Sequence, residues 1–208
     1  MRHEKKYRIE HSSESEIKQL LLSHPDSFST AFPDRHINSI YFDTAALTSF
    51  QQNQDGISQR TKYRIRWYGD SLSQISSPQL EIKIRDNEFG TKDITPLADF
   101  DLSQAHQLEA IAKKHIPLEL MPKVITRYKR AYYISHNQIL RATVDTAVTY
   151  HGFGKYQYKT VPHLDPAIIL ELKCAKEEVS FLSDACQHIP YRIQKNSKYV
   201  NGVFKTRF

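Results

Sequence analysis

Basic residues recur at every second position in one segment of this sequence. Lys62, Arg64 and Arg66 alternate with apolar and aromatic residues. Residues at positions i and i+2 of a β-strand share a face, so this spacing predicts a strand with one charged and one apolar face. Four more segments follow the pattern, with charged members Glu4, Lys6 and Arg8; Glu81, Lys83 and Arg85; Arg141 and Asp145; and Glu171 and Lys173. The planar guanidinium of arginine binds phosphate oxygens in a bidentate manner, so the pattern favours a phosphate ligand.

The simpler alternative is an ordinary half-buried sheet whose charged faces lie in water. Five such strands together argue against it. If the predicted helices cover the apolar faces, the charged faces converge on a shared groove or lumen. Like charges would repel there unless an extended anion lay among them.

Glutamates on these faces would repel a bound phosphate unless a cation lay between them and the phosphate. Mg²⁺ or Mn²⁺ bound by one or two carboxylates and by substrate phosphates is a common arrangement. Glu171 is the strongest metal candidate, because its strand is buried, and Glu4 and Glu81 are further candidates. The alternative for Glu171 is a salt bridge to a neighbouring basic residue.

Eight short segments, in order, resemble the vacuolar transporter chaperone (VTC) domain of polyphosphate polymerases. They are residues 3–7 (HEKKY), 39–44 (SIYFDT), 62–69 (KYRIRWYG), 80–83 (LEIK), 128–132 (YKRAY), 144–146 (VDT), 170–173 (LELK) and 197–199 (SKY). The resemblance covers about residues 3–204. The wider superfamily contains the triphosphate tunnel enzymes, among them CYTH-type adenylate cyclases and RNA or inorganic triphosphatases.

The resemblance implies a single VTC-like tunnel domain over residues 1–208. Its fold would be α+β: an antiparallel β-barrel tunnel with helices packed on the outside. It also implies transfer of the terminal phosphate of ATP to a growing polyphosphate chain, with Mn²⁺ or Mg²⁺ as cofactor.

The matching motifs predict the site residues of such an enzyme. Carried over by position, the phosphate-holding catalytic residues are Lys6, Arg64, Arg66, Lys83, Arg130 and Lys198; the substrate-binding residues are Arg8, Lys173, Lys195 and Ser197; the metal ligands are Glu171, Glu4 and Glu81. Arg2 replaces the first of the alternating glutamates that are frequent in the superfamily. This argues modestly against a two-metal hydrolase and for a longer polyanion.

Phosphoryl transfer in such a site depends mostly on positioning and charge neutralisation. The nucleophile would be an ionised terminal phosphate oxygen, and entry of water would instead hydrolyse triphosphate. A triphosphatase, a non-catalytic polyphosphate sensor and a nucleic-acid binder therefore remain alternatives. Glu171 counts against the sensor, and a tunnel that admits only a slim phosphate chain excludes duplex nucleic acid.

The elements that must position these residues are read from periodicity and turn residues. Strands are expected at about 3–10, 36–42, 58–68, 78–86, 123–135, 139–150 and 168–174, and helices at about 13–23, 44–52, 103–115, 177–188 and 197–204, with a turn at 87–90. Short turns between most neighbouring strands indicate antiparallel α+β architecture.

Composition sets the outer limits. The chain has 208 residues, 39% of them apolar and 25% charged, with a net charge of +6 and a pI of about 9.2. These values are typical of a globular protein with an acidic partner. No signal peptide or transmembrane span is expected, so the predicted location is cytoplasmic and any membrane partner would be a separate protein. Cys174 and Cys186 are expected to be buried apolar residues.

Overall fold

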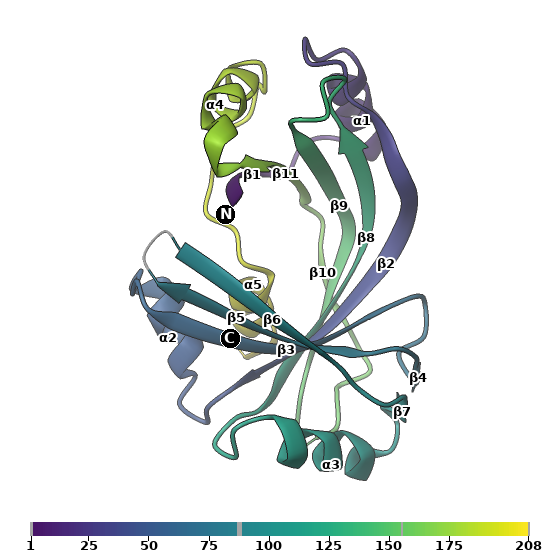
Figure 1. Ribbon diagram of the computed structural model, residues 1–208. Coiled ribbons are helices and arrows are strands. Elements are labelled where there is room, and N and C mark those ends of the chain that lie inside the picture. The colour runs from purple at the N-terminus through teal and green to yellow at the C-terminus, as the bar shows by residue number, and fades with distance from the viewer. Residues whose placement is uncertain (1, 87–88, 155, 208) are drawn as a thin grey trace. The chain divides into compact units, whose positions relative to one another are not determined.

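The computed structural model describes residues 2–86, 89–154 and 156–207 (Figure 1). The chain forms two compact units. Unit 1 contains residues 1–35, 128–148 and 165–196, and unit 2 contains residues 36–127, 149–164 and 197–208. Three long strands have residues in both units: β2 (Ser29–Asp43), β8 (Met121–Ile134) and β9 (Arg141–Gly152).

In unit 1 the strands follow the order β1-β11-β9-β8-β2. Strand β1 (Arg2–Ile9) pairs antiparallel with β11 (Ile168–Ala175), and β11 pairs antiparallel with β9. Helices α1 (Glu14–Leu22) and α4 (Val179–Gln187) contribute to the core of the unit, and the 3₁₀ turn η1 (Lys176–Glu178) precedes α4. Leucines of β11 and α4 meet in this core, so the apolar face of the sheet is the one the helices cover.

In unit 2 the strand order is β2-β3-β5-β6, and the printed pairings are antiparallel. The remaining elements are β3 (Arg60–Tyr68), β4 (Gln74–Ile75), β5 (Gln79–Asp86), β6 (Phe89–Pro96), β7 (Phe100–Asp101), α2 (Thr48–Gln54), α3 (Ala105–His115) and α5 (Lys198–Arg207). The short strand β10 (His163–Asp165) pairs with β9. Figure 1 shows α3 next to β7, which pairs with β4 in a separate two-stranded sheet.

The period-two prediction is confirmed for the central strands. Ile65, Trp67 and Leu80 are almost fully buried and pack with Leu108 and Ala112 of α3. Their chain neighbours, the basic residues of β3 and β5, lie on the opposite face. The α+β fold class, with an antiparallel sheet and helices on its outer faces, is as predicted. Tyr199 of helix α5 lies against the charged-face residue Lys62, whose ammonium is 5.9 Å from the centre of the tyrosine ring.

Several element boundaries differ from the predictions. β2 begins at Ser29, seven residues earlier than expected, and α2 begins only at Thr48. Of the predicted turn at 87–90, residues 87–88 lie outside the described residues, and Phe89 and Gly90 begin β6, a strand that was not predicted. The predicted helix 177–188 starts as η1 and becomes α-helical at Val179.

Within the described part of the chain, no helix has the length and apolar character needed to span a membrane. Cys174 is buried as expected, while Cys186 is partly exposed, and both are free thiols.

Candidate functional site

Three cations surround the carboxylate of Glu81 on the charged face of unit 2. Arg64 Nε donates to Oε2 at 2.6 Å, Lys92 Nζ donates to Oε1 at 3.1 Å, and Arg66 Nη1 lies 3.7 Å from Oε1. Glu81 is only 2% exposed, so burial alone would raise its pKa. Arg64 and Arg66 outweigh burial and lower the pKa of Glu81 to about 2. The carboxylate therefore stays ionised and acts as a counter-ion for the arginines.

Tyr41 of β2 adds an acidic phenol to the same group. Arg64 Nη1 donates to the Tyr41 hydroxyl oxygen at 3.0 Å, and the ring of Tyr199 from α5 stacks on Tyr41 at 5.3 Å. Burial would raise the pKa of Tyr41, but Arg64, Arg66 and Lys198 lower it to about 8. The positive field of this face thus makes the Tyr41 phenol more acidic than that of an ordinary tyrosine.

Lysines lie directly opposite one another across three neighbouring strands of unit 2. Lys62 of β3 pairs in register with Lys83 of β5, which pairs in register with Lys92 of β6. Like charges directly opposite each other destabilise a sheet. Lys62 Nζ also donates to Ser197 Oγ at 3.3 Å, next to Lys198 at the start of α5. An anion that contacts this row would offset the repulsion.

Unit 1 carries its own charged face, centred on Lys6. Lys6 Nζ lies 2.9 Å from Glu4 Oε1 and 3.5 Å from Glu171 Oε1, and Lys173 Nζ lies 3.2 Å from Glu171 Oε2. Burial would lower the pKa of Lys6, but Glu171 and Glu4 outweigh it and raise the pKa. Lys6 is therefore held as a cation between two carboxylates.

Two arginines of unit 1 are each paired with an aspartate that the sequence reasoning did not propose as a site residue. Arg130 Nε and Nη2 donate to Asp145 Oδ1 and Oδ2 at 2.5 and 2.7 Å, and Arg130 lies over the ring of Tyr128. Arg8 binds Asp165 through two hydrogen bonds of 2.9 and 2.7 Å. Asp145 shares a strand face with Arg141 in the sequence pattern, but no signal in the sequence pairs Asp165 with Arg8.

The predicted site residues fall into two groups, one in each unit. Unit 2 contains Arg64, Arg66, Lys83, Ser197, Lys198 and Glu81, and unit 1 contains Lys6, Arg8, Arg130, Lys173, Lys195, Glu4 and Glu171. Lys195 is exposed and precedes α5. Lys92 and Tyr41 were not predicted, because β6 was not recognised and the Tyr41 segment was read only as a family motif.

The carboxylates differ in how well they suit a divalent cation. Among the residues that the structure describes, no three His, Cys, Asp or Glu side chains form a group that could hold a metal ion. Glu4 and Glu171, however, contact the same ammonium, Lys6 Nζ. Mg²⁺ often takes only one or two carboxylates and completes its shell with phosphates and water, so this pair fits such an ion. Glu81 lies among three cations, and its role as a metal ligand stays a prediction.

Comparisons with known proteins identify the family. The model of the VTC domain matches residues 1–206. None of the curated proteins matches significantly. Among solved structures, a candidate adenylyl cyclase from Hippeastrum, described as having a dominant triphosphatase activity, aligns with a TM-score of 0.54 and 19% identity over 100% of this chain and 98% of that one.

Two more solved structures have a similar fold. A candidate adenylate cyclase from Vibrio parahaemolyticus aligns with a TM-score of 0.55 and 9% identity over 96% of this chain and 97% of that one. A Pyrococcus horikoshii protein aligns with a TM-score of 0.53 and 9% identity over 97% and 95% of the two chains. At such low identity these likenesses bear on the fold alone, and they agree with the family match. The chain belongs to the VTC domain family.

Proposed function

We propose that this chain is a metal-dependent phosphotransferase that makes polyphosphate by transferring the terminal phosphate of ATP to a growing chain. The observation that carries the proposal is the excess of cations on the charged face of unit 2. On the described parts of β3, β5 and β6, the carboxylate of Glu81 shares that face with several basic side chains, among them Lys62, Arg64, Arg66, Lys83 and Lys92. A polyanion with regularly spaced charges is the ligand that such a face would bind most strongly.

The arginines and lysines would orient the phosphates and neutralise the charge that develops during transfer. Arg64 and Arg66 already have their guanidinium groups fixed by Glu81, so little ordering is needed when a phosphate binds. Lys83 and Lys198 would contact further phosphates, and in unit 1 Lys6 and Arg130 would do so. Arg8, Lys173, Lys195 and Ser197 are proposed as additional substrate-binding residues.

Glu171 and Glu4 would hold Mn²⁺ or Mg²⁺. When bound, the ion supplies charge neutralisation at the substrate phosphate oxygens. The attacking phosphate oxygen is already ionised at neutral pH, so the residues of the chain need not supply a strong general base. What they supply is alignment of donor and acceptor.

A triphosphatase is the second candidate, because the Hippeastrum protein of similar fold is described as having a dominant triphosphatase activity. The same cationic faces would bind a triphosphate, and water would replace the phosphate chain as the nucleophile. We further propose that the protein acts in the cytoplasm on ATP, triphosphate and polyphosphate, with any membrane partner a separate protein.

The test is to incubate the purified protein with ATP and Mn²⁺ and to resolve the products. Polyphosphate chains with ADP would support the polymerase, and phosphate released from tripolyphosphate would support the hydrolase. Tight binding of polyphosphate without turnover would instead indicate a non-catalytic polyphosphate sensor. Arg66→Ala should weaken binding of every phosphate ligand, and unchanged affinity in that variant would contradict a phosphate role for the unit 2 face.

A further inference from the structure

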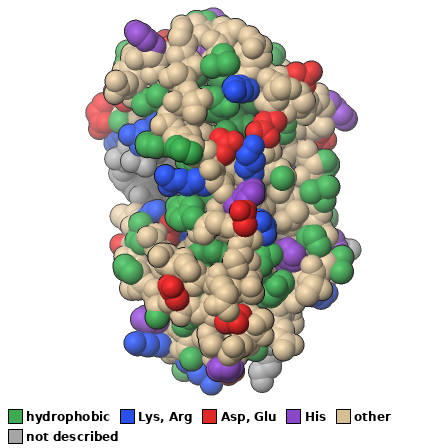
Figure 2. Space-filling model, turned by 90° about the vertical axis from the view of Figure 1, so that its right-hand side faces the viewer, with side chains coloured by type: hydrophobic (Ala, Val, Ile, Leu, Met, Phe, Trp, Pro, Cys, Tyr) green, Lys and Arg blue, Asp and Glu red, His purple; other side chains and the backbone are tan. Residues whose placement is uncertain are grey.

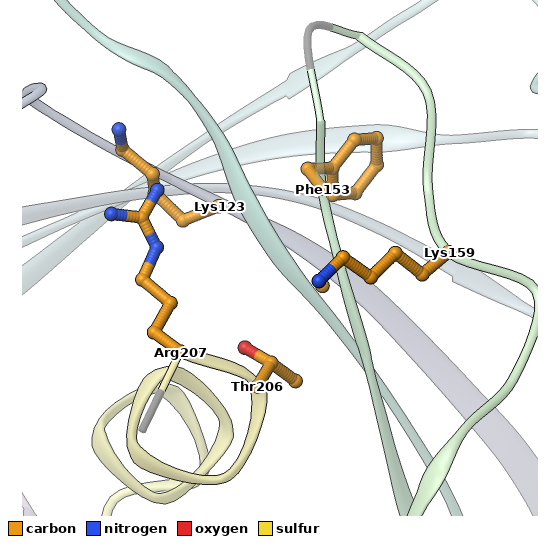
Figure 3. Close-up of a pocket in the computed structure, with 6 residues that line it drawn as sticks. Lys123, Phe153, Lys159, Thr206 and Arg207 are labelled. Atoms are coloured by element: carbon orange, nitrogen blue, oxygen red, sulfur yellow. The ribbon is translucent and has the colours of Figure 1, made fainter.

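A second cluster of cations in unit 2 shares no residue with the charged face. It surrounds a cavity of about 380 Å³ lined by Lys123, Gly152, Phe153, Lys159, Thr206 and Arg207. These residues come from β8, from the end of β9 and the segment that follows it, and from the last turn of α5 (Figure 3). Among the described residues, the lining contains no carboxylate, and none of the six is a residue of the charged faces.

Lys123 is an unusual member of the lining because it is a buried cation. Its side chain is 2% exposed, and no hydrogen bond or ion pair to its ammonium group is found among the described residues. Burial lowers the pKa of Lys123, and the nearby Arg207 lowers it further. Lysine is rarely buried this far without a partner, so the group lacks an anion that would compensate its charge.

Asp43, whose charge raises the pKa of Lys123, already has other hydrogen-bond partners. Its carboxylate accepts hydrogen bonds from the backbone N–H groups of Thr44, Ser49 and Phe50 at 2.8, 2.9 and 3.0 Å. It also accepts one from the Tyr199 hydroxyl. Asp43 offsets the burial of Lys123 only through space, which is the weakest of the three influences on the pKa of that lysine.

The walls of the cavity are close and fixed on one side. A Cβ atom at Gly152 would lie 3.1 Å from Thr206 Cβ, so β9 and α5 approach closely there. The Thr206 hydroxyl donates to the Gly202 carbonyl at 2.8 Å, which leaves its oxygen available as an acceptor. In Figure 3 the Lys123 and Arg207 side chains run next to each other, and Lys159 reaches toward them from the other side.

We propose that this cavity is a second anion site, which binds the phosphate or diphosphate group of a small molecule independently of the two charged faces. Lys159 and Arg207 are exposed and have long side chains, so both can contact a tetrahedral anion in the cavity. The same anion would contact the buried Lys123 on its other side. A cavity of this volume holds a phosphate or pyrophosphate, but it is too small for an extended polymer. The ligand class is therefore a small phosphorylated molecule or inorganic phosphate itself.

Amide NMR spectra of the full chain, titrated separately with inorganic phosphate, pyrophosphate and AMP, test the proposal. We expect saturable shifts of the Gly152, Phe153 and Thr206 amides with at least one of these probes, and the strongest probe identifies the source of the phosphate group. The Lys159→Gln/Arg207→Gln double variant should bind that probe about tenfold more weakly, since two charge-assisted contacts are lost. Both residues are exposed, so the variant should fold.

Lys205→Gln is the matched control, because it removes one charge from the same turn of α5 outside the cavity lining. Its affinity for the probe should equal that of the unaltered chain. The proposal is overturned if the cavity amides do not shift at millimolar ligand, if the double variant binds normally, or if Lys205→Gln weakens binding as much. In those cases the cations would serve only to balance the negative end of the α5 dipole. Shifts at Arg64 and Arg66 in the same spectra report the proposed phosphotransferase face, so failure of one site is distinguishable from failure of the other.

Discussion

At the residue scale, the carboxylates of both charged faces are paired with the cations that we propose bind phosphate. Glu81 contacts three cations, and Glu171 contacts Lys6 and Lys173. These contacts hold the basic groups in fixed positions while no phosphate is bound. If phosphate binds there as proposed, it must compete with the carboxylate for the same guanidinium or ammonium groups. Changing one carboxylate should then alter stability and affinity in opposite directions.

Glu81→Gln tests this competition. The variant should lose about 3 kcal/mol of unfolding free energy, because Arg64, Arg66 and Lys92 keep their charges without the buried carboxylate. It should also show a larger rise in Tm on adding polyphosphate, since the ligand no longer competes with Glu81. The pKa of Glu81 is lowered to about 2 from 4.5, so its stabilising effect is present above pH 4.5 and disappears as the pH falls toward 2. Urea unfolding should therefore show that Glu81→Gln is less stable than the unaltered chain at pH 7. Near pH 2 the two proteins should have nearly the same unfolding free energy.

Glu171→Gln should abolish turnover of ATP while it leaves polyphosphate affinity unchanged or higher. The substitution removes one carboxylate of the proposed metal pair, and it frees Lys6 and Lys173 from a competing charge. Steady-state assays in Mn²⁺ and a binding titration check the two halves of this expectation. Glu177→Gln, at an exposed position of η1 in the same unit, is the control and should behave like the unaltered chain. Normal activity in Glu171→Gln would remove this residue from the metal site.

The proposed binding of phosphate on the unit 2 face should depend on pH through Tyr41. Its pKa is lowered to about 8, so above pH 8 a phenolate adds negative charge beside Arg64. Polyphosphate affinity should then fall with rising pH, by at most about tenfold per pH unit, while the folded state itself gains stability relative to its value below pH 8. Tyr41→Phe should remove this decline between pH 8 and 9.5. Tyr68→Phe, also on the unit 2 sheet, should retain it, and a decline that persists in Tyr41→Phe would exclude this phenol as the cause.

At the element scale, alternation and capping were enough to predict most of the strands and helices. Ser13 and Glu16 form the predicted capping box at the start of α1, and Leu80 and Glu81 lie on the expected opposite faces of β5. Strand β6 was missed because its apolar alternation is weak: in the run from Thr91 to Thr95, only Ile94 is apolar. The first part of β2 is mostly exposed and contains Pro33. Its sequence therefore lacks the alternation of apolar and polar residues that marks a half-buried strand.

Pairings between distant segments set the limit of what the sequence predicts about the site. The basic residues of β1, β3, β5 and β11 were found by spacing, whereas Arg130, Lys195 and Lys198 were predicted from the family resemblance. Contacts between distant segments were not predicted. Arg8 meets Asp165 across 157 residues, and Tyr199 meets Asp43 across 156. Such contacts depend on the registers of strands and on the docking of α5, which no local pattern encodes. The same holds for the cavity around Lys123, whose lining comes from three separate segments.

Docking of α5 depends on the absence of a side chain at Gly202. A Cβ there would lie 2.8 Å from Tyr150 Cδ1 and 2.9 Å from Val124 Cγ2, two buried neighbours. Replacing glycine by alanine inside a helix normally stabilises by about 1 kcal/mol, but here overpacking should reverse the sign and cost about 1–3 kcal/mol. Gly202→Ala should also weaken polyphosphate binding, because Lys198 lies on the same helix.

Urea unfolding and a polyphosphate titration measure both effects of Gly202→Ala. Lys205→Ala introduces the same residue elsewhere in α5 and should leave stability within about 0.5 kcal/mol of the unaltered chain, as is usual for surface substitutions. A Gly202→Ala variant more stable than the unaltered chain would show that α5 does not depend on this close approach.

At the scale of the whole molecule, net charge alone does not distinguish a polyphosphate enzyme from a nucleic-acid binder. The chain carries a net charge of +6. In Figure 2, however, the Lys and Arg side chains in view are interspersed with Asp and Glu side chains. Lys129, for example, lies 3.0 Å from Glu14 and 2.9 Å from Asp34. Paired surface charges of this kind weaken long-range attraction to a duplex, whereas on the charged face of unit 2 several cations surround the single carboxylate of Glu81.

Competition between polyanions should therefore depend on their shape and not only on their charge. A labelled polyphosphate bound to the protein should be displaced by unlabelled polyphosphate at far lower concentration than by a DNA duplex of equal total charge. The slope of log affinity against log salt should also become steeper as the polyphosphate chain lengthens, because more counterions are released by each added phosphate contact. Fluorescence anisotropy at several salt concentrations measures both quantities, with Arg66→Ala as the variant that should flatten the slope. If the duplex displaces polyphosphate equally well, the binding surface is open and general, and the protein would have to be regarded as a binder of polyanions of any width.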